Sequence, residues 1–135
     1  MDMNVPQALL QLPLSNDGPA LDTAEYFFSD QLSAFYDKQL HAMWLRWSPS
    51  PRPNFNPALL QDLDRYCRFV MHTGGAVRCE GKDSPIEYAI LGSRVPGVFN
   101  LGGDLQLFTR LIEHQDRDGL SRYGRACVDV LYRNY

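Results

Sequence analysis

Apolar residues follow two different periods along the chain. Residues 32–36 and 40–47 are mostly apolar, and the polar residues 37–39 separate the two runs. In the second run apolar residues occupy both alternating sets of positions, the pattern of a strand that is apolar on both faces. The sequence therefore predicts a β-hairpin. The proline-rich stretch 48–53 ends it, because proline cannot donate to a sheet ladder.

A helical period follows the hairpin. Asn56 offers a side-chain acceptor to the first turn, and Pro57 suits the first helical position, so a helix start is predicted here. The apolar face that continues to about residue 71 consists of Leu59, Leu63, Tyr66, Cys67 and Val70. His72 and Thr73 with the glycines at 74 and 75 close the helix, because glycine readily adopts the left-handed conformation of a helix end.

The C-terminal half again places a strand before helices. Residues 86–91 form an apolar run that predicts a buried strand, and Asp104 is a natural N-cap for a helical pattern over 105–112. After the charged residues 116–118, a last helix is expected. Its inward face should consist of Leu120, Tyr123, Cys127, Val130 and Leu131. This order of strands and helices predicts an α/β fold.

The N-terminal segment differs from the rest in composition. Residues 1–31 carry Pro6, Pro13 and Pro19 and the turn-forming stretch 15–18, and their apolar pieces are short. We interpret residues 1–31 as an N-terminal arm that packs on the body or on a neighbouring subunit, and residues 32–135 as the folded domain.

Composition excludes several classes of protein. With 44% hydrophobic and 21% charged residues, the chain is expected to be neither disordered nor membrane-spanning, and no apolar run is long enough to cross a bilayer. The N-terminus has no basic segment followed by an apolar one, so no signal peptide is expected. A cytoplasmic protein is therefore expected. The net charge of −3 argues against a nucleic-acid surface. The three cysteines and three histidines show no ligand spacing, so we expect no metal site and no disulfide framework.

The stretch 98–105 is the best candidate for chemistry. The paired glycines Gly102 and Gly103 let the backbone approach a ligand and turn its N–H groups outward, and amides at a helix N-terminus stabilise negative charge. If the ligand is a thioester, such an amide can hold the oxygen that becomes an enolate. Losing one donor of this kind costs roughly 3 to 4 kcal/mol of transition-state stabilisation. Glycine turns also join strands to helices for structural reasons alone.

The sequence around these glycines resembles a motif of a known family. The run PGVFNLGGDLQLF is similar to the first oxyanion-hole motif of the crotonase, or enoyl-CoA hydratase/isomerase, superfamily, in which an aromatic residue, two variable residues, Gly, a small residue and Asp follow a strand. Upstream, SPSPRPNFNPALLQDLDRY resembles the loop and first helix of that fold, and downstream LIEHQDRDGLSRYGRACVDVLYR resembles its next helices. Within the superfamily, FNLGGDL followed by LF resembles most the bacterial diffusible-signal-factor synthases. The resemblance runs from about residue 32 to the end.

The resemblance implies a fold and a site. The fold would be the N-terminal half of a crotonase-like ββα spiral, with the arm in front of it. The backbone N–H of Gly103, aided by Gly102, would hold the acyl thioester oxygen, while Asp104 caps the helix and fixes the turn. The residues implied to border the bound substrate are Asn56, Phe99, Asn100, Leu101 and Asp104.

The resemblance also implies a reaction class. Its members hydrate or dehydrate 2-enoyl or 3-hydroxyacyl thioesters, and diffusible-signal-factor synthases dehydrate a 3-hydroxyacyl-carrier-protein thioester and hydrolyse the product, a step of fatty acid metabolism that serves quorum sensing. The substrate carries CoA or carrier protein, no further cofactor is implied, and complete members form trimers or hexamers.

Two interpretations of the chain stay open. The second amide donor and the acid–base glutamates of the family belong to a half of the fold expected beyond Tyr135, so we expect no turnover by these residues alone. The chain is then either a truncated part of a crotonase-type lyase or a natural half-protein. A half-protein would bind acyl-CoA without acting on it, or dock onto another subunit.

Overall fold

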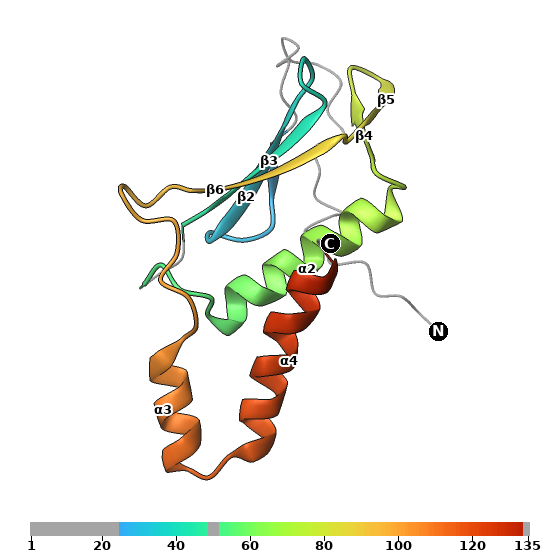
Figure 1. Cartoon of the computed structure of the whole chain (residues 1–135). Coiled ribbons are helices and arrows are strands. Elements are labelled where there is room, and N and C mark those ends of the chain that lie inside the picture. The colour runs from blue at the N-terminus through green and yellow to red at the C-terminus, as the bar shows by residue number, and fades with distance from the viewer. Residues whose placement is uncertain (1–24, 49–51, 134–135) are drawn as a thin grey trace.

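The predicted hairpin forms the middle of a four-stranded sheet in the computed structural model, which describes residues 25–48 and 52–133 (Figure 1). In order across the sheet, the strands are β1 (Glu25–Phe27), β2 (Leu32–Asp37), β3 (Ala42–Trp47) and β6 (Tyr88–Ser93). The first three run antiparallel, and β6 runs parallel to β3. Parallel neighbours need a long crossover connection, and α2 (Pro57–His72) with a small hairpin supplies it.

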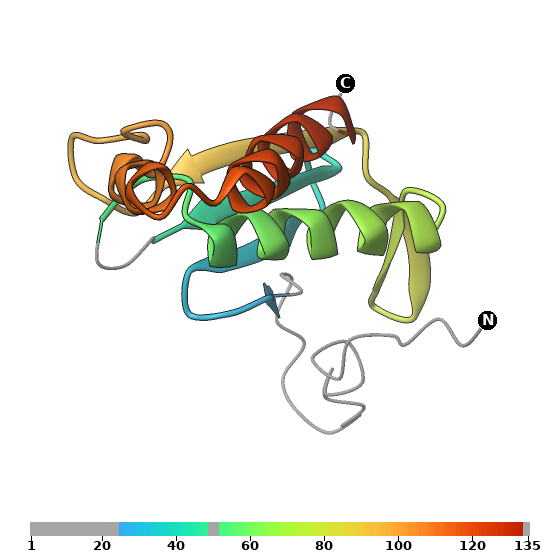
Figure 2. The same cartoon turned by 90° about the horizontal axis from the view of Figure 1, so that it is seen from below.

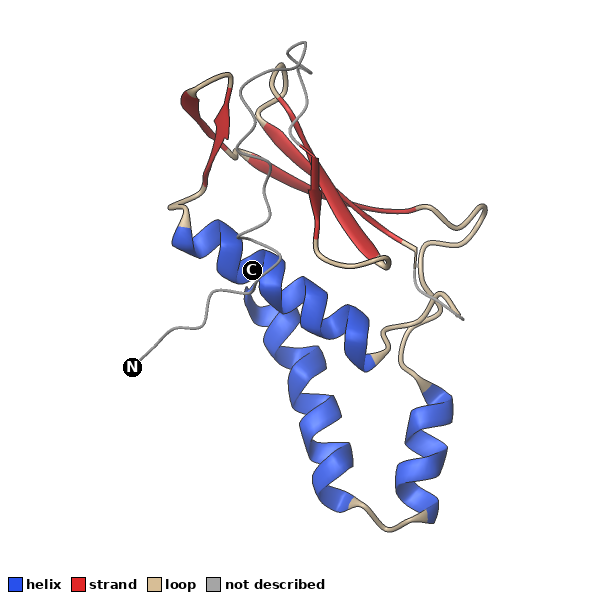
Figure 3. Cartoon of the chain, turned by 180° about the vertical axis from the view of Figure 1, so that it is seen from behind, coloured by secondary structure: helices blue, strands red, loops and turns tan. Residues whose placement is uncertain are grey.

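The helices lie on one side of the sheet (Figure 2). They are α2, α3 (Leu105–Glu113) and α4 (Arg117–Arg133). The C-terminal part of α4 lies against α2, while α3 and the beginning of α4 form a helical hairpin that projects away from the sheet (Figures 1 and 3). The expected α/β class is thus confirmed.

The core lies between α2 and the sheet face that looks toward it. Its largest fully buried side chains are Trp47, Tyr36, Leu32, Met43 and Leu59. The other face of the sheet carries an aromatic pair, because Phe35 and Trp44 stack with ring centroids 6.0 Å apart, and the Arg46 guanidinium lies over the Phe35 ring.

The ends of α2 follow the sequence prediction. The Asn56 side chain accepts a hydrogen bond from the Leu59 N–H at 2.9 Å, and Pro57 occupies the first helical position. At the other end, Gly74 and Gly75 have φ values of +65° and +75°, the left-handed conformation that stops a helix.

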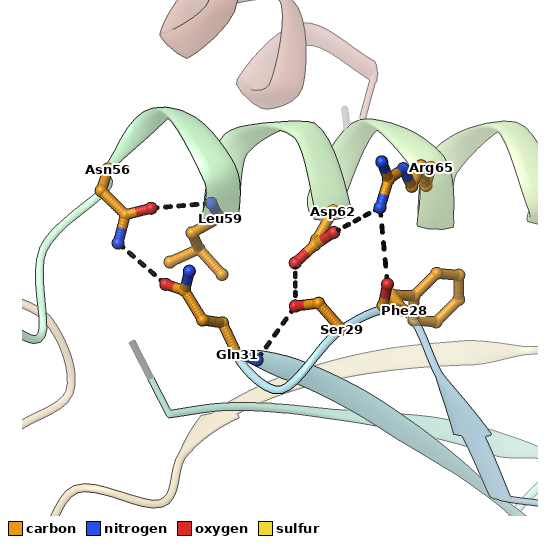
Figure 4. A network of polar contacts seen from close by, with 7 residues as sticks. All are labelled: Phe28, Ser29, Gln31, Asn56, Leu59, Asp62 and Arg65. Carbon is orange, nitrogen blue, oxygen red and sulfur yellow. Dashed lines mark hydrogen bonds and ion pairs between the residues drawn. The ribbon is translucent and has the colours of Figure 1, made fainter. Parts of the chain in front are cut away.

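A polar network ties α2 to the loop between β1 and β2 (Figure 4). Asp62 on α2 is only 2% exposed; its carboxylate accepts hydrogen bonds from the Ser29 hydroxyl and from Arg65, the latter at 3.0 Å. Nearby, the Asn56 side-chain amide donates to Gln31 at 2.8 Å. These contacts hold the loop on the helix and thereby set the spacing between α2 and the sheet.

Burial makes Asp62 a pH-sensitive member of this network. Desolvation raises the pKa of Asp62 above its ordinary value, although the Ser29 and Arg65 contacts lower it. A raised folded-state pKa means that the folded chain binds more protons than the unfolded chain between the two pKa values. The stability of the wild type should therefore rise, relative to that of Asp62→Asn, as the pH falls from neutral toward 4.

Urea unfolding at a series of pH values measures this difference. Asp83→Asn, which removes an exposed carboxylate on a hairpin strand, controls for the loss of one charge and should give a flatter difference. The prediction would be contradicted if the unfolding free energy of the wild type, relative to that of Asp62→Asn, decreased as the pH falls.

Two short elements are absent from the sequence prediction. The first, β1, lies at 25–27 within the stretch assigned to the arm; residues 1–24 of that arm lie outside the described residues. The second is a hairpin of β4 (Ala76–Cys79) and β5 (Lys82–Pro85). Its turn residues Glu80 and Gly81 have φ values of +49° and +74°, a turn geometry for which Asn-Gly is the usual signal.

The prediction of a buried strand at 86–91 is wrong in two respects. The strand runs from Tyr88 to Ser93, and it lies at the edge of the sheet with exposed residues along it. On α4, Tyr123 is buried as expected, but Leu131 is 75% exposed and does not face inward. In both elements an apolar pattern is present, and within the described residues no further layer covers it fully.

Candidate functional site

The glycine turn lies beside the segment that leads into α2. The Phe55 N–H donates to the Gly102 carbonyl at 2.8 Å, the Leu101 N–H donates to the Pro53 carbonyl at 2.6 Å, and Phe55 and Gly103 form a parallel bridge. Residues 53–55 and 101–103 are therefore paired, although almost fifty positions separate them.

Tyr123 of α4 completes this arrangement. Its hydroxyl donates to the Phe55 carbonyl at 2.7 Å and accepts from the Asp104 N–H at 2.8 Å. Burial raises the pKa of Tyr123, so the hydroxyl keeps its proton and remains a donor at neutral pH. One side chain thus joins α4 to both paired segments.

Side chains around the turn fix its shape. The Asn100 side chain accepts a hydrogen bond from the Gly102 N–H at 2.7 Å, and Gly102 has a φ of +88°, which a residue with a Cβ rarely adopts. Asp104 accepts from the Leu107 N–H at 3.1 Å, which confirms that it caps α3. The roles implied for Asn100 and Asp104 at a substrate remain predictions.

Phe99 connects the turn to the core. Its carbonyl accepts a hydrogen bond from the Trp47 indole N–H at 2.8 Å, and its ring packs on that indole with centroids 4.8 Å apart. The outer part of the Phe99 ring is exposed, as is the side chain of Leu101. Both therefore present apolar surface next to the glycines, where the resemblance places the substrate.

The Gly103 amide differs from its neighbours. The N–H groups of Leu101, Gly102 and Asp104 all donate hydrogen bonds. The Gly103 N–H has no acceptor among the residues that the structure describes, and Gly103 is exposed. A donor held in a rigid turn without an acceptor can bind an oxygen atom supplied by a ligand.

Asn56 lies next to this turn, because it directly follows Phe55, which pairs with Gly103. Both polar ends of its side chain bond within the fold, one to the Leu59 N–H and one to Gln31. Its observed role is to start α2.

Two cavities lie beside α2 and α4, and of these two only the second has a residue of the paired segments, Phe55, in its lining. One, of about 870 Å³, lies between the three helices and includes Leu107 and Tyr123 together with charged residues such as Asp64 and Arg68. The other, of about 390 Å³, has mainly apolar walls and includes Phe55 and Tyr66. Burial raises the pKa of Tyr66 to about 12, so this phenol is not a base at neutral pH.

Across residues 25–48 and 52–133, no three histidine, cysteine or acidic side chains converge in a way that could hold a metal ion. None of the helices in this part of the chain is long and apolar enough to span a membrane.

Sequence reasoning missed Tyr123 and Trp47 as parts of this site. Tyr123 was expected only as an inward-facing residue. A signal was present, since a buried tyrosine usually places its hydroxyl against a polar partner. Comparison with known proteins finds no family model and no characterised protein that matches the chain.

Proposed function

We propose that this chain is a crotonase-superfamily protein that binds acyl thioesters through the backbone amide of Gly103. In this proposal the fold is the N-terminal half of a ββα spiral, and the family reaction is the hydration or dehydration of a 2-enoyl or 3-hydroxyacyl thioester, as in diffusible-signal-factor synthesis. Because the motif match supplies no acid–base glutamate, we expect binding rather than turnover from these residues alone.

The state of the Gly103 N–H carries the proposal. Among the amides of residues 101–104 it is the one without an acceptor in the described part of the chain, while hydrogen bonds to Pro53, Asn100 and Tyr123 hold the other three. The donor is therefore preorganised, so a thioester oxygen would meet it without rearrangement of the backbone. The adjoining N-terminus of α3 adds a favourable field for negative charge.

The matched pair Gly103→Pro and Gly103→Ala tests this role. Gly103 does not have a positive φ, and a Cβ here would lie 3.6 Å from the Tyr123 hydroxyl and 3.7 Å from the Phe108 ring, which is ordinary contact. Alanine should therefore keep both the turn and the N–H, whereas proline removes the N–H. Loss of this hydrogen bond should weaken the binding of octanoyl-CoA roughly 2- to 12-fold.

Calorimetry and NMR measure the effect. In ¹⁵N-glycine-labelled protein, the Gly103 signal, identified by its loss in Gly103→Ala, should move downfield with octanoyl-CoA but not with S-octyl-CoA, which lacks the carbonyl. Equal affinity of the proline and alanine variants, or an unmoved Gly103 signal at saturation, would contradict the proposal. Thioester hydration by the purified chain that Gly103→Pro abolishes would contradict the expected lack of turnover.

A second candidate function is subunit assembly without catalysis. The observation that favours it is the apolar surface on α3, where Leu105 and Ile112 are exposed and no residue is buried. A chain that binds neither octanoyl-CoA nor S-octyl-CoA would favour this candidate.

A further inference from the structure

Among residues 25–48 and 52–133, no strand pairs with the outer side of the edge strand β6. Its Tyr88 N–H donates to the His41 carbonyl, and the Arg94 N–H just after it donates to the Trp47 carbonyl. Along a strand, the backbone groups of alternate residues point to the same side, so the even-numbered residues of β6 bond to β3. The N–H and C=O groups of Ala89, Leu91 and Ser93 therefore point toward the free edge.

This edge lacks the usual protection against pairing. The strand reads YAILGS, with no charged residue and no proline, whereas natural edge strands are commonly short or carry charges. The opposite edge of the sheet follows that rule, because β1 has only three residues and begins with an exposed glutamate. Of the two edges, β6 is therefore the one suited to accept another strand.

Apolar surface continues from β6 onto α4. Ala89 and Leu91 line the 390 Å³ groove together with Cys127 and Leu131 of α4, and Leu91 is 41% exposed. Val128, Leu131 and Tyr132 of α4 are also exposed. A six-residue strand alone offers much less than the roughly 800 Å² per partner of a stable interface, and these side chains enlarge the contact area.

We infer that β6 pairs antiparallel with β6 of a second copy of this chain. The free edge needs a strand that is apolar on both faces, and β6 itself has that pattern. Pairing the outward residues 89, 91 and 93 with one another puts the two-fold axis at Leu91, opposite Leu91 of the second copy.

The same symmetry brings the helices together. A two-fold axis normal to the sheet places both helix layers on one side, so the exposed apolar residues of one α4 face the other α4 across the joined strands. The result is one continuous eight-stranded sheet, from the four strands of each copy. This inference does not depend on the proposed thioester chemistry.

Sedimentation equilibrium of the full chain tests it. The expected mass is twice 15.4 kDa at micromolar concentration, and Leu91→Lys should restore the monomer because its charge would lie in the seam. Phe27→Lys, which alters an equally apolar, exposed position on the opposite edge strand, should leave the dimer intact. A monomeric wild type, or a Leu91→Lys variant that remains dimeric, would overturn the inference.

Cross-linking decides the case in which Leu91→Lys fails to fold. Opposed residues of a hydrogen-bonded antiparallel pair have Cα atoms about 5.5 Å apart, within the range of a disulfide. Oxidised Leu91→Cys should therefore give a covalent dimer that wild type and Phe27→Cys do not give. A trimer, or any oligomer in which Leu91→Cys does not cross-link, would show a different interface.

Discussion

Replacing Trp47 by alanine should lower the free energy of unfolding by about 3 to 5 kcal/mol. The indole is fully buried; it packs edge-on against Phe55, with ring centroids 5.4 Å apart, and in a tilted arrangement against Phe99, with centroids 4.8 Å apart. Truncation leaves a cavity at the point where the sheet, the start of α2 and the turn meet. It also removes the donor to the Phe99 carbonyl. Since native domains are stable by only about 5 to 15 kcal/mol, this loss is a large share.

Guanidinium unfolding followed by far-UV circular dichroism measures this effect, because the substitution removes one of two tryptophans from the fluorescence signal. Trp47→Phe keeps one aromatic ring but loses the N–H donor and part of the indole volume, so it should cost less than the alanine variant, about 1 to 3 kcal/mol. If the alanine variant were destabilised no more than the phenylalanine variant, ring packing would not be the source of the stability.

Removing the Tyr123 hydroxyl should cost about 1 to 3 kcal/mol, a large effect for one oxygen atom. Tyr123→Phe keeps the ring edge-on to Phe108, at 5.2 Å between centroids, so packing is preserved. The Phe55 carbonyl and the Asp104 N–H both lose the Tyr123 hydroxyl as hydrogen-bond partner. Water can replace it only if the paired segments separate.

Hydrogen exchange shows where this energy is lost. The Asp104 amide should exchange faster in Tyr123→Phe than in the wild type, and the variant should unfold at a lower denaturant concentration. Tyr132→Phe removes a hydroxyl from a side chain that is 79% exposed on the same helix, and it should change neither quantity. Unchanged exchange at Asp104 in Tyr123→Phe would mean that the hydroxyl does not hold the turn.

Local signals predicted the parts of the fold that depend on neighbouring residues. Asn56 and Asp104 are helix caps, and a cap involves only the residue itself and the next turn, so sequence alone was sufficient. The hairpin of β2 and β3 was predicted for the same reason, since its apolar runs and the polar link between them are continuous in sequence.

Other features depend on what lies across from a residue. The apolar run that became β6 looks the same in sequence at an edge as in the middle of a sheet, so its exposure could not be predicted. Leu131 continues the period of Tyr123 along α4, but no described element covers it. The link from Tyr123 to Phe55 spans 68 positions, a separation that no local pattern reports.

The contact between Trp47 and Phe99 gives the protein an intrinsic optical probe. The indole is anchored in the core, yet the aromatic ring and carbonyl that it contacts belong to the exposed turn beside Gly103. Any ligand or substitution that displaces residue 99 must change the polarity around the indole and hence its emission. Opening of the turn can therefore be followed by fluorescence. The Trp47→Phe variant gives the emission of Trp44 alone, which is subtracted to obtain the signal of Trp47.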